Sequence, residues 1–292
     1  MKSLFIVNPR SGLRRRIDIT AAIRSHCGEP FEIVRCDDPE TLDAIIDDAV
    51  RDRFEVVYAV GGDGTVHEIA KRVMKTPLAL GIVPAGSGNG LARHLNIPMA
   101  IEKALAACRE GVIAAIDTAV VNGRPYFGVM GIGLDAVIAA RFASSRVRGL
   151  RTYVRVGLPA YARYRPEEYD IEVDGTLHSC RAVILAIANS SQYGNNARIA
   201  PLASLQDGLL DVVAIERTPL WAAPRMLLRL FNGTFDRSPG VRVVQGSKVH
   251  VRRAAAGPAH IDGEPVTLPA ELDLAIRPRS LRVLLPAGAI HI

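Results

Sequence analysis

Short apolar runs alternate with amphipathic stretches along the first part of the chain. Polar or glycine-containing segments bound the apolar runs, which cover residues 4–7, 31–35, 56–60, 78–83 and 113–121. Apolar residues recur at the spacing of one helix face in residues 16–26, 41–51, 66–74 and 101–109. This alternation of strand and helix patterns predicts a parallel sheet covered by helices.

After residue 122 the pattern becomes rich in strands. The apolar runs are residues 126–130, 169–173, 177–188, 209–215, 247–251, 272–276 and 281–285, and helical patterns cover residues 136–143, 150–164 and 220–231. Asn122-Gly123 and Asp174-Gly175 separate apolar runs in the way that two-residue hairpin turns do. This part of the chain is therefore predicted to be mainly antiparallel.

The predicted fold is α/β with two domains. Residues 1–120 form a doubly wound, mainly parallel sheet domain, and residues 121–292 form a mainly antiparallel, β-sandwich-like domain, whose last strand could also pack back on the first domain. Ligands of open α/β sheets bind at the carboxyl ends of the strands, so the active site is expected in the cleft between the domains.

Composition narrows the class of protein. Of the 292 residues, 49% are hydrophobic, which is enough for a sizeable core. The longest apolar run, residues 182–188, is far shorter than the roughly 18 residues of a membrane-spanning helix, and residues 4–7 are too few for a secretory signal. A cytoplasmic protein is predicted. The four cysteines form no C-x-x-C pair, which favours reduced, buried thiols over a zinc site or a disulfide framework.

The charge distribution indicates an anionic partner. The net charge is 36 minus 30, or +6, and seven arginines lie between residues 141 and 165 without an acidic residue among them. Nucleic acid is disfavoured, because only 5% of the residues are aromatic and no nucleic-acid-binding motif is present. The patterns at 146–165 and 220–231 fit either amphipathic helices at the anionic inner face of a membrane or helices packed on the β-rich domain with solvated arginines. The sequence leaves the oligomeric state open, a homodimer included.

A glycine-rich turn carries the clearest chemical signal. The sequence Val60-Gly61-Gly62-Asp63-Gly64-Thr65 leaves a predicted strand and enters a predicted helix. Backbone N–H groups in such a turn, together with the helix N-terminus, form a site for phosphate. Asp63 would repel a phosphate, so a metal, a sugar hydroxyl or another cation is expected beside it. Thr65 and Glu68 also fit a capping box that starts the helix.

Two further loops follow neighbouring predicted strands. One is Pro84-Ala85-Gly86-Ser87-Gly88-Asn89-Gly90 and the other is Asn8-Pro9-Arg10-Ser11-Gly12. Each could be a plain connection. If the strand order is ordinary, all three loops converge on one edge of the sheet. Residues 81–87 have the spacing of a P-loop but lack its lysine, so that nucleotide motif does not fit.

Six motifs in a fixed order give the chain a specific resemblance. They are N-P-x-S-G from Asn8, G-G-D-G-T-x-x-E from Gly61, P-x-G-S-x-N-x-L-A-R from Pro84, G-I-G-L-D-A at 131–136, A-P-L-A with D-G-L-L-D at 200–211, and D-G-E at 262–264. In this order they resemble the catalytic domain of the diacylglycerol kinase family, which includes sphingosine kinases and bacterial lipid kinases. The resemblance covers nearly the whole chain, whereas G-G-D-G-T alone is shared with NAD kinases and phosphofructokinases.

The resemblance implies an ATP-dependent lipid kinase that transfers the γ-phosphoryl group to a lipid hydroxyl, of diacylglycerol or a related lipid, with ATP and Mg²⁺ as cofactors. It implies that Asp262 is the general base and that Glu264 assists it. The implied ATP-binding residues are Asn8, Ser11, Gly12, Gly61, Gly62, Asp63, Gly64, Thr65, Gly86, Ser87 and Asn89. Asp63 would serve the magnesium bound with ATP, Asp117 a charge network below the phosphates, and Asp207 with the Leu209 carbonyl a structural magnesium.

The residues alone also allow plainer interpretations. Asp262-Gly263 predicts a type I′ hairpin turn, and Asp117 a solvated turn residue. Two positions depart from the family pattern: Leu13, followed by three arginines, stands where the family often has lysine, and Ser204 stands where members frequently have an acid.

Two other functions compete with a lipid kinase. A NAD kinase-like phosphotransferase would call for an Asn-Glu pair, which the chain lacks. A catalytically silent nucleotide-sensing module is disfavoured because Asp63, Asp262 and Glu264 are all present.

Overall fold

The computed structural model describes residues 1–11, 18–27, 30–143 and 159–287, so the predictions made on Gly12, Leu13, Arg14 to Arg16 and residues 144–158 lie outside the described residues. The chain divides into two compact units. Unit 1 comprises Met1–Asp117 and Pro278–Ile292, and unit 2 comprises Thr118–Arg277. The chain leaves unit 1 within strand β5 (Val112–Val121) and returns within strand β16 (Glu271–Leu285).

Unit 1 is built on a parallel sheet. Its strands, in spatial order, are β2 (Phe31–Arg35), β1 (Ser3–Val7), β3 (Val56–Gly61) and β4 (Ala79–Pro84). The end of β16 adds in parallel to β4, with Val283 opposite Leu80. Every residue of β1, β3 and β4 is buried, as expected for strands covered on both faces.

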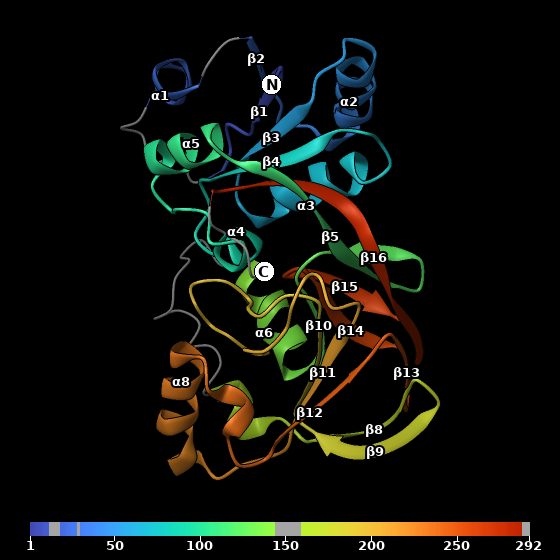
Figure 1. Ribbon diagram of the computed structural model, residues 1–292. Helices are drawn as coiled ribbons and strands as arrows, with labels where there is room; N and C mark the ends of the chain where they lie inside the picture. Colours follow the sequence, from blue (N-terminus) through green and yellow to red (C-terminus); the bar gives the residue numbers. More distant parts are fainter. Residues whose placement is uncertain (12–17, 28–29, 144–158, 288–292) are drawn as a thin grey trace. The chain divides into compact units, whose positions relative to one another are not determined.

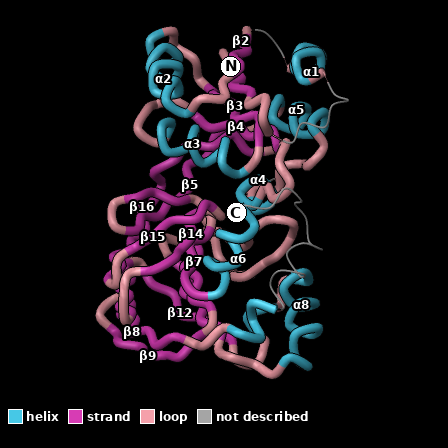
Figure 2. The backbone as a smooth tube through the Cα atoms, turned by 180° about the vertical axis from the view of Figure 1, so that it is seen from behind, coloured by secondary structure: helices cyan, strands magenta, loops and turns pink. Residues whose placement is uncertain are grey.

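Helices cover both faces of this sheet (Figures 1 and 2). One pair is α1 (Ile19–His26) and α5 (Ile101–Arg109), and the other is α2 (Leu42–Arg51), entered through the 3₁₀ turn Pro39–Thr41, and α3 (Asp63–Val73). Ile23 of α1 and Leu105 of α5 pack in one cluster with Phe5 and Tyr58, whose rings stack 4.2 Å apart. The predicted doubly wound α/β unit is therefore confirmed.

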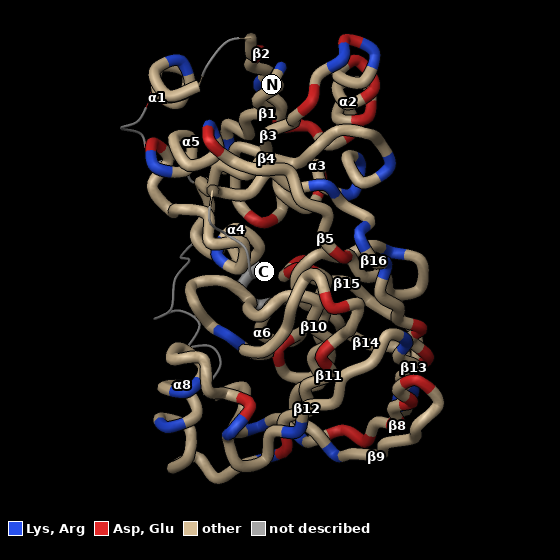
Figure 3. The backbone as a smooth tube through the Cα atoms, viewed as in Figure 1, with Lys and Arg blue, Asp and Glu red and all other residues tan. Residues whose placement is uncertain are grey.

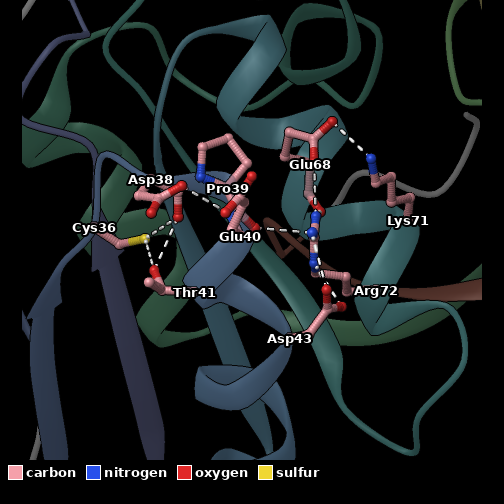
Figure 4. A network of polar contacts seen from close by, with 9 residues as sticks. All are labelled: Cys36, Asp38, Pro39, Glu40, Thr41, Asp43, Glu68, Lys71 and Arg72. Atoms are coloured by element: carbon pink, nitrogen blue, oxygen red, sulfur yellow. Dashed lines mark hydrogen bonds and ion pairs between the residues drawn. The ribbon is translucent and has the colours of Figure 1, made fainter.

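Arg72 joins the pair of helices α2 and α3 (Figure 4). Its guanidinium pairs with Asp43 of α2 at 2.8 Å and with Glu68 of α3 at 2.7 Å, and it donates to the Pro39 carbonyl at 2.9 Å. The Lys71 ammonium also pairs with Glu68, at 2.8 Å.

These contacts contradict the capping-box interpretation of Thr65 and Glu68. Helix α3 has Gly62 as its N-cap without a side-chain cap, and Thr65 lies inside the helix. The Glu68 carboxylate pairs with Lys71 and Arg72, which lie one turn further along the helix. It therefore forms ion pairs within the helix instead of capping the helix start.

Unit 2 is a β-sandwich. One sheet is antiparallel and has the order β12 (Val241–Gly246), β11 (Leu210–Ile215), β10 (Ile184–Ala188), β7 (Val129–Gly133), β14 (Gly257–Ile261) and β15 (Glu264–Leu268). The facing strands are β16, β13 (Lys248–Arg253), β8 (Glu167–Val173) and β9 (Thr176–Ala182), and β5 pairs with β16 and with β6 (Arg124–Tyr126). Met130 and Leu185 of the first sheet meet Ile171 and Val251 of the second in one core, which confirms the predicted sandwich.

Helices in unit 2 lie outside this core. Those in the described part of the unit are α6 (Leu134–Ala143), a helical segment at residues 159–163, the 3₁₀ turn Leu220–Ala222 leading into α8 (Ala223–Asn232), and the 3₁₀ turn Phe235–Arg237. Within the described ranges, no helix combines the length and the apolar character needed to cross a bilayer.

Only Cys108 among the free cysteines is buried, so the prediction of buried thiols was wrong for Cys27, Cys36 and Cys180, which are partly exposed.

Three Asx-Gly pairs form the tight turns that the sequence predicts. Both residues have positive φ in Asn122-Gly123 (47° and 78°), Asp174-Gly175 (47° and 85°) and Asp262-Gly263 (50° and 86°). Positive φ at both central positions defines the type I′ turn. The third turn joins β14 to β15, with Ile261 opposite Glu264.

Candidate active site

Three loops of unit 1 leave the carboxyl ends of adjacent strands and contact one another. After β1, the Asn8 backbone donates to the Val60 carbonyl at 3.1 Å, and the Asn8 side chain donates to the Thr65 hydroxyl at 3.0 Å. After β4, the Ala85 N–H donates to the Gly61 carbonyl at 2.7 Å. The loops that the sequence predicts at one edge of the sheet are therefore linked by hydrogen bonds.

Glycines allow the second and third loops to approach closely. A Cβ added to Gly86 would lie 2.5 Å from the Gly62 Cα, and a Cβ added to Gly62 would lie 3.2 Å from the Gly86 Cα. Gly61 faces the Thr65 side chain in the same way. A side chain at Gly86 would have to displace backbone, so this contact requires glycine.

Asp63 connects the two glycine-rich loops. One carboxylate oxygen accepts from the Asn89 N–H at 2.8 Å and the other from the Gly90 N–H at 2.7 Å. These N–H groups begin the short helix α4 (Gly90–His94), which has no cap from its own N-cap residue. The negative charge of Asp63 thus meets backbone donors within the protein, a partner that the sequence did not suggest.

Asn89 and Ser11 shape the loops on which they lie. Asn89 is buried with φ of 53°, and its side chain accepts from the Gly86 N–H at 3.1 Å and donates to the Gly86 carbonyl at 2.9 Å. The Ser11 hydroxyl donates to the Asn8 carbonyl at 2.7 Å. Ser87 is exposed at the tip of its loop, and Gly64 lies in the first turn of α3.

Asp117 is buried within β5, and its Oδ1 accepts from the Arg279 N–H at 2.7 Å. The interpretation of Asp117 as a solvated turn residue was wrong, because β5 continues through this position as a strand to Val121.

In unit 2, the carboxylate of Asp262 is fixed by backbone donors. Its oxygens accept from the Phe127 N–H at 3.0 Å and the Gly128 N–H at 2.8 Å, and its own N–H donates to the Val129 carbonyl at 3.0 Å. Glu264 is exposed at the start of β15. Positive φ at Asp262 and at the next residue places a tight turn between Asp262 and Glu264.

In the loop predicted to hold a structural magnesium, a hydrogen bond joins the two residues proposed as its ligands. Asp207 is exposed, and its Oδ1 accepts from the Leu209 N–H at 3.0 Å. Asp211, on β11, is buried and accepts from Gln245 at 3.2 Å; burial, with the charge of Asp207 adding to it, raises the pKa of Asp211 to about 6. Among the residues that the structure describes, no group of three or more His, Cys, Asp or Glu side chains is arranged to hold a metal ion.

Sequence reasoning assigned no role to a buried cluster in unit 2. Asp135 accepts from the Ala136 N–H at 2.8 Å, the Tyr193 hydroxyl at 3.0 Å and His260 Nε2 at 3.2 Å. Gly131 leaves the space for this contact, because a Cβ there would collide with the Asp135 and His260 side chains. In the sequence, the first glycine of the G-I-G-L-D-A motif, Gly131, was the signal that could have indicated this cluster.

Family models match both parts of the chain. Residues 2–121 match the diacylglycerol kinase catalytic domain, and residues 128–285 match the YegS C-terminal NAD kinase beta sandwich-like domain. The fold and these matches define a lipid kinase. The chain belongs to the diacylglycerol kinase family, as its motifs predict.

Individual relatives agree with this assignment. The chain is 28% identical over 218 residues to the "Diacylglycerol kinase" of Bacillus subtilis, covering 72% of this chain and 71% of that one. It is 29% identical over 231 residues to the "Probable lipid kinase YegS-like" protein of Pectobacterium atrosepticum, covering 76% and 75%.

Solved structures share the fold. A diacylglycerol kinase of Bacillus anthracis aligns with a TM-score of 0.72 at 17% identity over 99% of this chain and 98% of that one. An NAD kinase of Archaeoglobus fulgidus in complex with ATP aligns with a TM-score of 0.53 at 14% identity, over 99% and 95%.

Proposed function

We propose that this lipid kinase transfers the γ-phosphoryl group of ATP to a hydroxyl of diacylglycerol or a related lipid, with Asp262 as the general base. The observation that carries the proposal is the pair of interlocked glycine loops in unit 1. Gly62 and Gly86 present bare backbone to each other, and Asp63 fastens the second loop to the first. Loops of this kind at a helix N-terminus bind phosphate through their N–H groups.

The residues present fit a magnesium ion bound with ATP. Asp63 is a carboxylate held beside the glycine-rich loops by backbone N–H donors, and carboxylate oxygen is the kind of ligand that Mg²⁺ takes. Mg²⁺ at sites of phosphoryl transfer is held by one or two carboxylates together with the phosphates. When bound, Mg²⁺ would offset the negative charge of the phosphate oxygens.

Asp262 supplies the base of the proposed transfer. Two backbone N–H groups orient its carboxylate, which accepts the proton of the lipid hydroxyl. The hydroxyl oxygen forms a bond to the γ-phosphorus as the bond to the leaving ADP oxygen breaks. General-base help of this kind contributes about 10² to 10⁴ in rate.

A lipid panel with γ-labelled ATP tests the proposal. Diacylglycerol, a sphingoid base, an isoprenoid alcohol and phosphatidylglycerol are each incubated with the protein, and the lipids are examined by mass spectrometry. Label in a lipid supports the proposal. Label transferred to NAD instead would favour the NAD kinase-like alternative, and ATP binding without transfer to any acceptor would favour a nucleotide-sensing module.

We further propose that α8 contacts an anionic membrane surface. No residue of this helix is buried, and Trp221, just before it, is 83% exposed, while Leu228 is 66% exposed. Arg225 and Arg229 lie on the same helix, where basic residues are seen in Figure 3. Exposed tryptophan and leucine beside arginine are typical of helices at a lipid interface.

Vesicle co-sedimentation tests the membrane contact. Leu228→Asp should weaken binding to vesicles that contain phosphatidylglycerol. Leu177→Asp is the matched control, because Leu177 is 67% exposed on β9 of the same unit. Equal binding by both variants at low and high salt would exclude α8 from the contact.

A further inference from the structure

Unit 2 buries polar atoms around Asp262 that the proposed proton transfer does not use. The Ser190 hydroxyl and Nδ1 of His260 have no hydrogen-bond partner among the described residues. Ser190 is 0% exposed and His260 is 3% exposed. Native proteins keep few buried polar atoms without partners, because such atoms destabilise the fold. Each of these two therefore needs an explanation.

Ser190 and the proposed base Asp262 both lie against Gly128. A Cβ added to Gly128 would lie 3.0 Å from Oδ1 of Asp262 and 3.5 Å from the hydroxyl oxygen of Ser190. The Ser190 N–H donates to the Gly128 carbonyl at 3.1 Å, which fixes the serine beside the start of β7. The Ser190 hydroxyl therefore lies close to the Asp262 carboxylate, with Gly128 between them.

His260 presents an acceptor on the outer face of the same sheet. Its neighbours Ala259 and Ile261 face the sandwich core, so the alternation of the strand places His260 on the opposite face. Nε2 contacts the Asp135 carboxylate at 3.2 Å. Because a carboxylate only accepts, Nε2 carries a proton, and in the neutral form of the ring Nδ1 is an acceptor. The Tyr193 hydroxyl, bound to the same carboxylate oxygen, helps to fix this arrangement.

We propose that Ser190 and His260 bind the hydroxyl-bearing head of the acceptor lipid, and that Asp135 and Tyr193 position the His260 ring. The inference rests on the proposed function and names residues of the acceptor site. A hydroxyl of the head donates to Nδ1 of His260, and Ser190 either donates to or accepts from an oxygen of the head. These contacts direct the reacting hydroxyl to the Asp262 carboxylate.

Steady-state kinetics with 1,2-dioctanoylglycerol in mixed micelles tests the two residues. Ser190→Ala should raise KM for the acceptor about three- to tenfold, the range expected for one neutral hydrogen bond, and leave KM for ATP unchanged. His260→Gln should act in the same direction, because the glutamine amide can still donate to Asp135 but has no counterpart of Nδ1. An unchanged acceptor KM in both variants, or a rise in KM for ATP alone, overturns the inference.

Ser238→Ala is the matched control. Ser238 is also buried in unit 2 with a hydroxyl that has no partner among the described residues, but it precedes β12, at the opposite side of the six-stranded sheet from β14. This variant should keep both KM values. A rise in acceptor KM equal to that of Ser190→Ala would mean that loss of a buried hydroxyl acts through general destabilisation, and would overturn the assignment of Ser190.

A binding measurement without ATP separates this inference from the proposed function. In ¹⁵N-histidine NMR spectra, dioctanoylglycerol micelles should move the Nδ1 signal that His260→Gln removes, and empty micelles should not. A shift without any phosphoryl transfer supports the acceptor site and overturns the proposed function. Transfer to dioctanoylglycerol without a shift overturns the role of His260 and leaves the proposed function intact.

Discussion

Replacing Asp63 by alanine should uncouple the two glycine-rich loops. The carboxylate accepts two backbone N–H groups, at 2.7 and 2.8 Å, that open helix α4. A hydrogen bond to a charged group contributes about 1.5 to 3 kcal/mol, and loss of a helix cap costs about 0.5 to 2 kcal/mol. Because Asn89 and Gly90 are buried, water replaces the lost acceptor poorly. We expect Asp63→Ala to lower the free energy of unfolding by about 2 to 4 kcal/mol.

Asp18→Ala is the matched control for this variant. Asp18 also accepts two backbone N–H groups, from Thr20 at 3.0 Å and Ala21 at 3.1 Å, as the cap of α1 in the same unit. Since this cap is exposed, its removal should cost only about 0.5 to 2 kcal/mol. Urea denaturation of the two variants compares the costs directly.

ATP titration by calorimetry, with Mg²⁺ and with a chelator, distinguishes two roles of Asp63. If the carboxylate positions the phosphate loops, Asp63→Ala should weaken ATP binding at least roughly tenfold, or about 1.4 kcal/mol, under both conditions, while Asp18→Ala binds normally. A variant that loses affinity only when Mg²⁺ is present would show that Asp63 acts through the metal alone and would refute the positioning argument.

Three further outcomes are expected. Gly86→Ala should impair ATP binding more than Gly62→Ala in calorimetry, because its Cβ would lie 2.5 Å from backbone rather than 3.2 Å; equal effects would argue against the close loop contact. Arg72→Ala should lower the free energy of unfolding by about 1 to 3 kcal/mol with unchanged ATP affinity, since its ion pairs join α2 and α3 away from the loops; urea denaturation without a difference from wild type would contradict this role. Burial raises the pKa of Asp211 in the folded protein to about 6, from an ordinary value of 3.8, so the carboxyl of the unfolded chain loses its proton first and wild type loses stability as pH rises through this window. Asp211→Asn should therefore be more stable than wild type by up to about 3 kcal/mol at pH 8 and lose that advantage near pH 4, as urea denaturation at several pH values can show.

The fold of unit 1 could be predicted closely because its signals are local. The strand at Phe31–Arg35 and the helix at Ile101–Arg109 have the predicted bounds, since apolar periodicity and flanking polar residues define both. Helix α4 was missed because its five residues are too few for a helical period.

Unit 2 was harder to predict from pattern alone. The run at 177–188 divides at Val183 into β9 and β10, which lie in different sheets, and the runs at 272–276 and 281–285 form the single strand β16. Strand β14, Gly257–Ile261, was not predicted because proline and histidine interrupt its apolar pattern. The buried His260 has its polar contact with Asp135 of helix α6, and the periodicity of the strand sequence cannot reveal a contact with another element.

In the candidate site, too, local features could be predicted from the sequence and contacts between distant residues could not. Glycine-rich turns at strand ends have a local signature, so the three loops were predicted. Asp63 meets its backbone partners 26 and 27 residues away, and Asp135 meets His260 125 residues away. Contacts over such separations depend on the complete tertiary structure, and no local pattern indicates them.

The most direct test of the proposed transfer compares wild type with Asp262→Asn. Both proteins are titrated with ATP and then assayed for transfer of labelled γ-phosphate to the lipid panel. We predict that wild type labels a lipid, and that Asp262→Asn binds ATP with unchanged affinity but loses about 10² to 10⁴ of the turnover. Full turnover by Asp262→Asn would show that another group accepts the hydroxyl proton, and the central assignment would be wrong.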